Sequence, residues 1–151
     1  MPPVVGEPAP LFTLPSTSGS DVSLAQYRGK ANVLLAFFPL AFTTTCTAEM
    51  SCFSEDFTRF EGAGAVVLPI SVDSVPSLRE FKTKENLGLD LLSDFKREVC
   101  RAYGTLLEDK FFSRRAYFLV DKQGILRWAH TEAELGHRRD DDELLAQIAA
   151  L

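Results

Sequence analysis

An uninterrupted apolar run at residues 32–38 (NVLLAFF) is the feature that most constrains the fold of this chain. A strand in which polar residues do not alternate with apolar ones is buried on both faces, as in the middle of a covered sheet. Pro39 ends the run, because proline has no backbone N–H to donate to a sheet. The apolar period then changes to that of a helix. Its predicted buried stripe comprises Cys46, Met50, Phe53, Phe57 and Phe60.

The rest of the chain continues the alternation of strand and helix patterns. Further strands are expected at residues 12–14, 22–24, 65–72, 89–92, 116–120 and 125–130. Further helices are expected at residues 74–86, 94–103 and 140–151. Pro69 lies inside one predicted strand and argues for an edge, a bulge or an early end there. The pattern predicts one α/β domain over residues 1–151, a three-layer sandwich with a mixed central sheet, helices on both faces and an N-terminal β-hairpin.

Composition and charge exclude several classes of partner. The 151 residues carry 16 basic and 21 acidic side chains, a net charge of −5 without a basic stripe, so nucleic acid is not an expected partner. The longest mainly apolar run, residues 33–42, is about half the ~20 residues of a membrane-spanning helix. The N-terminal sequence MPPVVGEPAP lacks the basic start and apolar stretch of a secretory signal. We therefore expect a cytoplasmic protein that does not bind a membrane.

The three cysteines, Cys46, Cys52 and Cys100, are an odd number and too few for a disulfide scaffold. Cys46 falls in the first turn of the helix that follows the central strand, where free N–H groups and the helix dipole favour a thiolate. Thr43, three residues earlier, is close enough for its hydroxyl to meet the sulfur. A buried core cysteine on the apolar stripe explains the position of Cys46 equally well. The position of Cys46 alone therefore fits both a reactive thiolate and a buried core cysteine.

The spacing of Pro39, Thr43 and Cys46 resembles the Pro-x-x-x-Thr-x-x-Cys signature of the peroxiredoxins, thiol peroxidases of the thioredoxin-like fold. The segment AFFPLAFTTTCTAEM is most similar to the one-cysteine AhpE-like branch, and then to the PrxQ (bacterioferritin comigratory protein) branch. The resemblance extends from residues 6–12 to the segment Arg-Ala-x-Phe-x-Val-Asp at 115–121. It implies a thioredoxin-like fold for the whole chain.

The resemblance also implies an activity and a set of roles. Cys46 would attack hydrogen peroxide or an organic hydroperoxide and become a sulfenic acid. Arg115 would hold the thiolate, Pro39 would shield it from water, and Arg114 would be a surface residue. A small thiol or a thioredoxin- or glutaredoxin-like protein would act as the reductant, with no metal or organic cofactor. A homodimer is usual for the family, and Phe38, Phe42 and Phe112 could face the partner subunit or belong to the core.

The route of recycling stays open between an external thiol, Cys52 and Cys100. Cys52 is the sixth residue after Cys46, whereas the PrxQ pattern places its resolving cysteine at the fifth. On a continuous helix Cys52 points about 120° away from the face of Cys46. Cys100 lies off the predicted apolar stripe of Phe95, Val99 and Ala102, so we expect it near solvent.

Other classes of protein have weaker support. A thioredoxin-type reductase would need Cys-x-x-Cys, but Thr47, Ala48 and Glu49 follow Cys46. His130 and His137 have neither zinc-ligand spacing nor a protease motif, and we expect both at the surface. Glu49 is interpreted only as favouring the start of the helix, and residues 132–142 as a solvated surface. A non-catalytic thioredoxin-like binding module is the alternative from another class.

Overall fold

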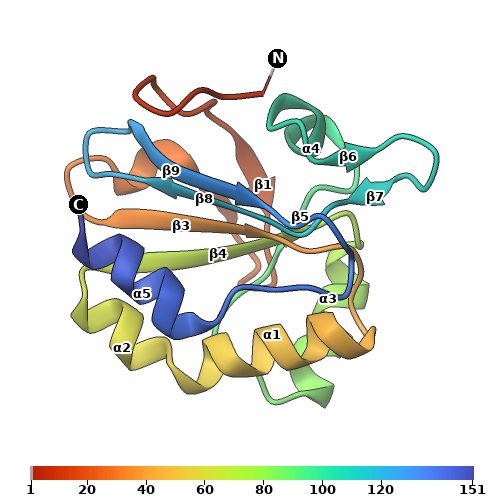
Figure 1. The fold of residues 1–151 in the computed structure, drawn as a ribbon. Coiled ribbons are helices and arrows are strands. Elements are labelled where there is room, and N and C mark those ends of the chain that lie inside the picture. Colours follow the sequence, from red (N-terminus) through yellow and green to blue (C-terminus); the bar gives the residue numbers. More distant parts are fainter. Residues whose placement is uncertain (1) are drawn as a thin grey trace.

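The computed structural model describes residues 2–151 and is built around a five-stranded sheet with the order β5-β4-β3-β8-β9 (Figure 1). These strands are β3 (Asn32–Phe37), β4 (Ala65–Ser71), β5 (Leu92–Ser93), β8 (Ala116–Val120) and β9 (Leu126–Thr131). β3 is parallel to β4 and antiparallel to β8, so the sheet is mixed. The predicted central strand is confirmed, because β3 has a neighbour on each side and is buried from Val33 onward.

The other strands form two small antiparallel pairs. They are β1 (Thr13–Pro15) with β2 (Asp21–Ser23), and β6 (Leu106–Leu107) with β7 (Phe112–Ser113). The first pair is the predicted N-terminal hairpin, whereas the second was not anticipated. The helices are the 3-10 helix η1 (Leu24–Tyr27), α1 (Thr44–Glu55), α2 (Phe57–Gly62), α3 (Val75–Lys84), α4 (Glu98–Ala102) and α5 (Asp141–Ala149). No helix within residues 2–151 is long and apolar enough to cross a membrane.

Helices cover both faces of the sheet. Leu34 and Ala36 of β3 point to the face covered by α1, α2, α3 and α5. The alternate residues Leu35 and Phe37 point to the other face, where α4, η1 and β1 pack. Figure 1 shows α1, α2 and α5 on one side of the sheet and α4 with β1 on the other. The three-layer α/β sandwich is confirmed.

The helix after β3 is not continuous, in contrast to the prediction. Asp56 has φ −94° and ψ 11°, which ends α1, and α2 starts at the next residue. The break changes which face is buried beyond it. Phe60 is still buried, but Phe57 is 42% exposed and drops out of the expected stripe.

The predicted helix over residues 94–103 is also shorter than expected. Arg97 adopts a left-handed φ of 65°, so α4 begins only at Glu98. Asp94 nevertheless caps the helix, because its carboxylate accepts the N–H groups of Val99 (3.2 Å) and Cys100 (2.7 Å). Since Phe95 precedes the helix, it is 60% exposed rather than buried.

β4 is not the edge strand that Pro69 suggested, but at Pro69 its outer side is unpaired. β4 is an inner strand by order, but its outer neighbour β5 pairs only with Ile70 and Ser71. Pro69 lies just before this short pairing, where the missing N–H of proline costs no ladder hydrogen bond on the outer side.

Candidate active site

The corner between β3 and α1 is held by contacts from the next strand. The N–H of Ala41 donates to Oδ2 of Asp73 (2.9 Å), and the hydroxyl of Ser71 donates to the same oxygen (2.7 Å). Phe42 has a left-handed φ of 68°, which is unusual for a bulky residue. Its ring packs edge-to-face on Phe81 with centroids 5.1 Å apart. The sheet and α3 therefore together fix the direction in which α1 starts.

Cys46 lies in the first turn of α1. The first backbone bond of this helix runs from the N–H of Thr47 to the carbonyl of Thr43 (2.9 Å), so earlier N–H groups remain as donors at the helix start. Cys46 is 1% exposed, but its side chain lines a hollow at this corner. We call this the active-site hollow. Its lining residues are Pro39, Leu40, Thr43, Thr44, Thr45, Cys46, Phe112, Arg115, Leu135 and Gly136.

Arg115 reaches the sulfur from a distant part of the chain. Its Nη2 lies 3.2 Å from Sγ of Cys46, 69 positions earlier, and also donates to the carbonyl of Leu135 (3.2 Å). Arg115 directly precedes β8, which pairs with β3, so the two strands bring the guanidinium and the sulfur to one corner. Burial lowers the pKa of Arg115, but the neighbouring Glu49 and Cys46 raise it overall and keep the guanidinium charged. Arg114 is exposed, as expected.

Glu49 is a member of the site that the sequence interpretation missed. It is fully buried, and Oε1 accepts Nη1 of Arg115 (2.7 Å) while Oε2 accepts the hydroxyl of Tyr117. Burial raises the pKa of Glu49, and the two donors oppose that rise. The available signal was its spacing, because a residue three positions after Cys46 lies on the same face of α1.

Tyr117 links this pair to the C-terminal part of the chain. Burial, reinforced by Glu49, raises the pKa of Tyr117, which keeps its hydroxyl protonated as a donor. The same oxygen accepts the backbone N–H of Arg139 (3.0 Å). Arg139 belongs to residues 132–140, which join β9 to α5 and which we call the β9–α5 connector.

The β9–α5 connector is not the solvated surface that its charges suggested. Leu135 and Gly136 line the active-site hollow, and Glu132 is buried. The carboxylate of Glu132 accepts a hydrogen bond from Nε of Arg139 (2.8 Å), and its backbone N–H donates to the carbonyl of Arg115 (2.9 Å). The charged residues therefore anchor the connector rather than only solvating it.

Thr43 lines the active-site hollow but does not make the expected contact with the sulfur. Its hydroxyl donates to the carbonyl of Leu40 (2.8 Å), and within residues 2–151 it forms no hydrogen bond to Cys46. The reason is local, because Thr43 is the N-cap of α1 in extended conformation (φ −88°, ψ 156°) and its side chain turns back toward the corner. Pro39 lines the same hollow beside it.

The structure does not bring the other two cysteines to the active-site hollow. Cys52 is half-buried, and its sulfur accepts Nη2 of Arg138 (3.6 Å). Cys100 is fully buried rather than near solvent, and it packs on the opposite face of the sheet from Cys46. Burial and the nearby Asp94 raise the pKa of the Cys100 thiol, which disfavours its reactive anion.

The structure also places the aromatic residues and histidines that the sequence singled out. Phe38 is fully buried and therefore belongs to the core, Phe112 is half-buried beside the active-site hollow, and Phe42 is 48% exposed. His130 is half-buried and stacks with both Tyr117 and Trp128, whereas His137 is exposed. Within residues 2–151 there is no group of three or more His, Cys, Asp or Glu that could hold a metal ion.

The fold and the site together define a class of protein, an α/β sandwich with a cysteine and an arginine at one strand–helix corner. Residues 5–129 match the AhpC/TSA family. The chain is 38% identical over 149 residues to alkyl hydroperoxide reductase E of Mycobacterium tuberculosis, covering 97% of each protein. It is 40% identical over 128 residues to a Coxiella burnetii protein whose name, bcp, places it among the peroxiredoxins, covering 81% of this chain and 84% of the relative.

The crystal structure of the reduced Plasmodium vivax 2-Cys peroxiredoxin is also similar. It aligns with a TM-score of 0.91 and 32% identity, covering 99% of this chain and 82% of that one. The chain therefore belongs to the AhpC/TSA family, and it is a peroxiredoxin, a thiol-dependent peroxidase of the thioredoxin-like fold. This assignment agrees with the resemblance of the sequence and favours the enzyme over a non-catalytic binding module.

Proposed function

We propose that Cys46 is the peroxidatic nucleophile of this thiol peroxidase, and the observation that carries the proposal is the 3.2 Å contact between its sulfur and Arg115. The thiolate attacks one oxygen of the peroxide, the O–O bond breaks, and the second oxygen leaves as water or an alcohol after taking up a proton. The sulfur gains one oxygen and becomes a sulfenic acid.

The residues around the sulfur divide the work of catalysis. Arg115 contacts the reacting sulfur and stabilises charge on the departing oxygen, together with the free N–H groups at the start of α1. Thr43 directs its hydroxyl hydrogen to Leu40, so its oxygen is available to accept a hydrogen bond from the peroxide O–H. Pro39 keeps water from one side of the sulfur. These contacts hold the O–O bond in line with the attacking sulfur.

The active-site hollow supports a substrate range that includes organic hydroperoxides. Leu40, Phe112 and Leu135 contribute apolar side chains to its lining. An alkyl group attached to the peroxide would contact these side chains, whereas hydrogen peroxide needs only the polar groups near Cys46. We expect both kinds of substrate to react.

We propose that an external thiol recycles the sulfenic acid. Support comes from the placement of Cys52 beside Arg138 and of Cys100 on the far face of the sheet. A small thiol or the thiol of a thioredoxin- or glutaredoxin-like protein would attack the sulfenic sulfur and release water. A second thiol would then reduce the mixed disulfide and restore Cys46.

Intact-mass analysis after one equivalent of hydrogen peroxide tests both steps. We compare the wild type with Cys52→Ser and Cys100→Ser. A gain of one oxygen in all three proteins is the expected result, and Cys46→Ser should show no rapid gain. A loss of two hydrogens in the wild type that one substitution abolishes would instead identify an internal resolving cysteine.

We also propose a cytoplasmic homodimer. A reducing compartment keeps all three thiols free, as they are in this structure. Phe42 is 48% exposed, so its ring is open to contact with a partner subunit. Sedimentation equilibrium of the wild type and of Phe42→Ser checks the dimer, which the substitution should weaken.

A further inference from the structure

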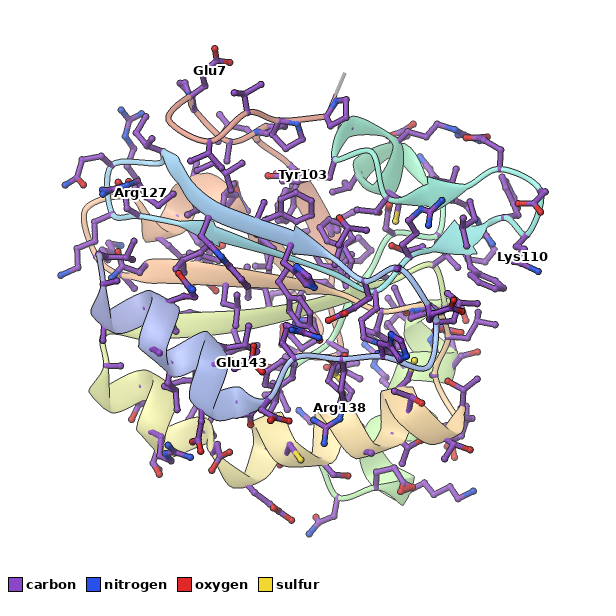
Figure 2. All side chains as sticks on the ribbon, in the orientation of Figure 1. Glu7, Tyr103, Lys110, Arg127, Arg138 and Glu143 are labelled. Carbon is purple, nitrogen blue, oxygen red and sulfur yellow. The ribbon has the colours of Figure 1, made fainter. Side chains whose placement is uncertain are left out.

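A second hollow lies around Cys52, away from the active site. It is formed by α1, α2, the β9–α5 connector and the start of α5. We call it the Cys52 hollow. Its lining residues are Cys52, Asp56, Arg59, Arg138, Asp140, Asp141 and Asp142. In Figure 2 the side chain of Arg138 extends from the connector toward α1.

The sulfur in this hollow has a cation beside it. Nη2 of Arg138 lies 3.6 Å from Sγ of Cys52, and the thiol is half-buried rather than enclosed. The thiolate is the form of a cysteine that attacks disulfides, and this thiol is open enough for a small disulfide to reach it. Cys100 lacks both properties, because it is fully buried next to a carboxylate.

The hollow also contains a buried acid without a donor. Asp141 is 7% exposed, and within residues 2–151 neither of its oxygens accepts a hydrogen bond from an N–H group or a hydroxyl, so the carboxyl of Asp56 is its polar neighbour. Burial and the neighbouring Asp56 raise the pKa of Asp141 to about 7. A buried acceptor without a donor is costly, so this side chain is suited to a ligand that supplies one.

The charges select the kind of ligand. Arg59 is already bound by Asp56 (3.4 Å) and Asp142 (2.7 Å), and Arg138 faces the sulfur. The groups left to meet a ligand are therefore mainly carboxyls. An ammonium group has three donors and no acceptor, which matches Asp141 beside Asp56. A carboxylate ligand would be repelled.

We propose that the Cys52 hollow binds small ammonium-bearing disulfides and that Cys52 forms a mixed disulfide with the bound half. The Cys52 thiolate attacks one sulfur of R–S–S–R, the S–S bond of the reagent breaks, and Cys52–S–S–R forms. The other half leaves as RS⁻ and takes a proton from water. Cys52 is oxidised, the departing half is reduced, and an excess of free thiol reverses the exchange. This site is separate from the peroxidatic reaction proposed for Cys46.

Three disulfides of similar size but different charge test the proposal. They are cystamine (ammonium), bis(2-hydroxyethyl) disulfide (neutral) and 3,3′-dithiodipropionate (carboxylate). The protein is the full chain with Cys46→Ser, and the rate of adduct formation is measured by intact mass. The measure is the ratio of the rate with cystamine to the rate with the neutral reagent. We expect this ratio to be about tenfold higher for the protein than for a free thiol such as N-acetylcysteine, because the bound ammonium gains one charge-assisted hydrogen bond. Adding Cys52→Ser should abolish the adduct.

Matched variants separate the hollow from the general charge of the protein. Asp141→Asn should reduce the preference for cystamine to that of the free thiol, whereas Glu143→Gln, an exposed change of equal charge on the same helix, should leave it intact. Arg138→Gln should slow all three reagents alike. The proposal is overturned if the wild-type hollow shows no preference beyond the free thiol, if Asp141→Asn keeps the full preference, or if the adduct forms on Cys100. Circular dichroism confirms that each variant is folded.

Discussion

Glu49 and Arg115 form a buried ion pair of 2.7 Å in which neither side chain is more than 1% exposed. Burying both charges gives little net stability compared with an apolar pair, because each loses its hydration. The main effect of the pair is to fix the orientation of the Arg115 guanidinium. With Nη1 on Glu49, the guanidinium can direct Nη2 only toward Cys46 and Leu135. Glu49 is thus a positioning residue for the arginine.

Glu49→Gln should therefore lower both stability and activity. The substitution keeps the shape of the side chain but leaves the Arg115 charge without its buried counterion, and removing one partner of such a pair costs about 3 kcal/mol. Urea unfolding measures the loss of stability, and stopped-flow peroxide consumption measures the activity. Glu143→Gln is the control, because its carboxylate is exposed and should change stability by less than about 0.5 kcal/mol. Equal effects of the two changes would contradict the positioning role.

Arg115→Lys should reduce the rate of peroxide reduction by about a hundredfold, the typical cost of losing one donor to a developing oxyanion. A lysine ammonium is a single point and cannot contact Glu49 and Cys46 with two separate nitrogens as the guanidinium does. The second-order rate constant with hydrogen peroxide is the measurement. Arg114→Lys, at the exposed neighbouring position, should leave that constant unchanged. A wild-type rate in Arg115→Lys would remove the arginine from the proposed mechanism.

Tyr117→Phe tests the second contact of Glu49. The change removes the hydroxyl that donates to Glu49 and accepts from Arg139, at a cost of about 1–3 kcal/mol for the buried groups left unpaired. Because the link to the β9–α5 connector is lost, hydrogen exchange of the Arg139 amide should also become faster. Unchanged exchange at Arg139 would show that Tyr117 does not hold the connector.

Much of the fold can be predicted from the sequence because its signals are local. The apolar run of β3 and the change of period after Pro39 identify the central strand and α1, and β8 and β9 follow from the turn at residues 121–124. The errors arise where a single backbone conformation overrides the pattern. Asp56 breaks the helix, and the left-handed Arg97 delays α4, so Phe95 lies outside the helix and is exposed.

In the candidate site, too, the residues that can be predicted are those with a local sequence signal. Pro39, Thr43 and Cys46 share one corner of the chain, so their spacing is sufficient to recognise them. Arg115 was identified only through a family motif. Glu49 could not be distinguished from an ordinary helix residue, because its partners Arg115 and Tyr117 lie 66 and 68 positions away and meet it only in the folded core.

The pKa of Asp141 makes a prediction about stability against pH. Burial and Asp56 raise this pKa to about 7 in the folded chain, whereas an unfolded aspartate titrates near ~3.9. Between these values the unfolded state loses its proton first. The contribution of Asp141 to stability should therefore be highest below pH ~4, fall as the pH rises toward ~7, and level off above it. Asp141→Asn removes this titration.

Asp141→Asn should raise the free energy of unfolding at pH 8 by about 1–2 kcal/mol and change it little at pH 4. A shift of about three pKa units would correspond to ~4 kcal/mol without screening, but the Cys52 hollow is open to solvent, which reduces the effect. Urea unfolding from pH 4 to 8 measures the difference. Asp142→Asn is the matched control, because its carboxylate is exposed on the same turn and pairs with Arg59 at the surface. If Asp141→Asn and the wild type gave parallel stability curves over this range, the buried acid would carry its charge from low pH, and the donor that satisfies it would already be present in the folded chain.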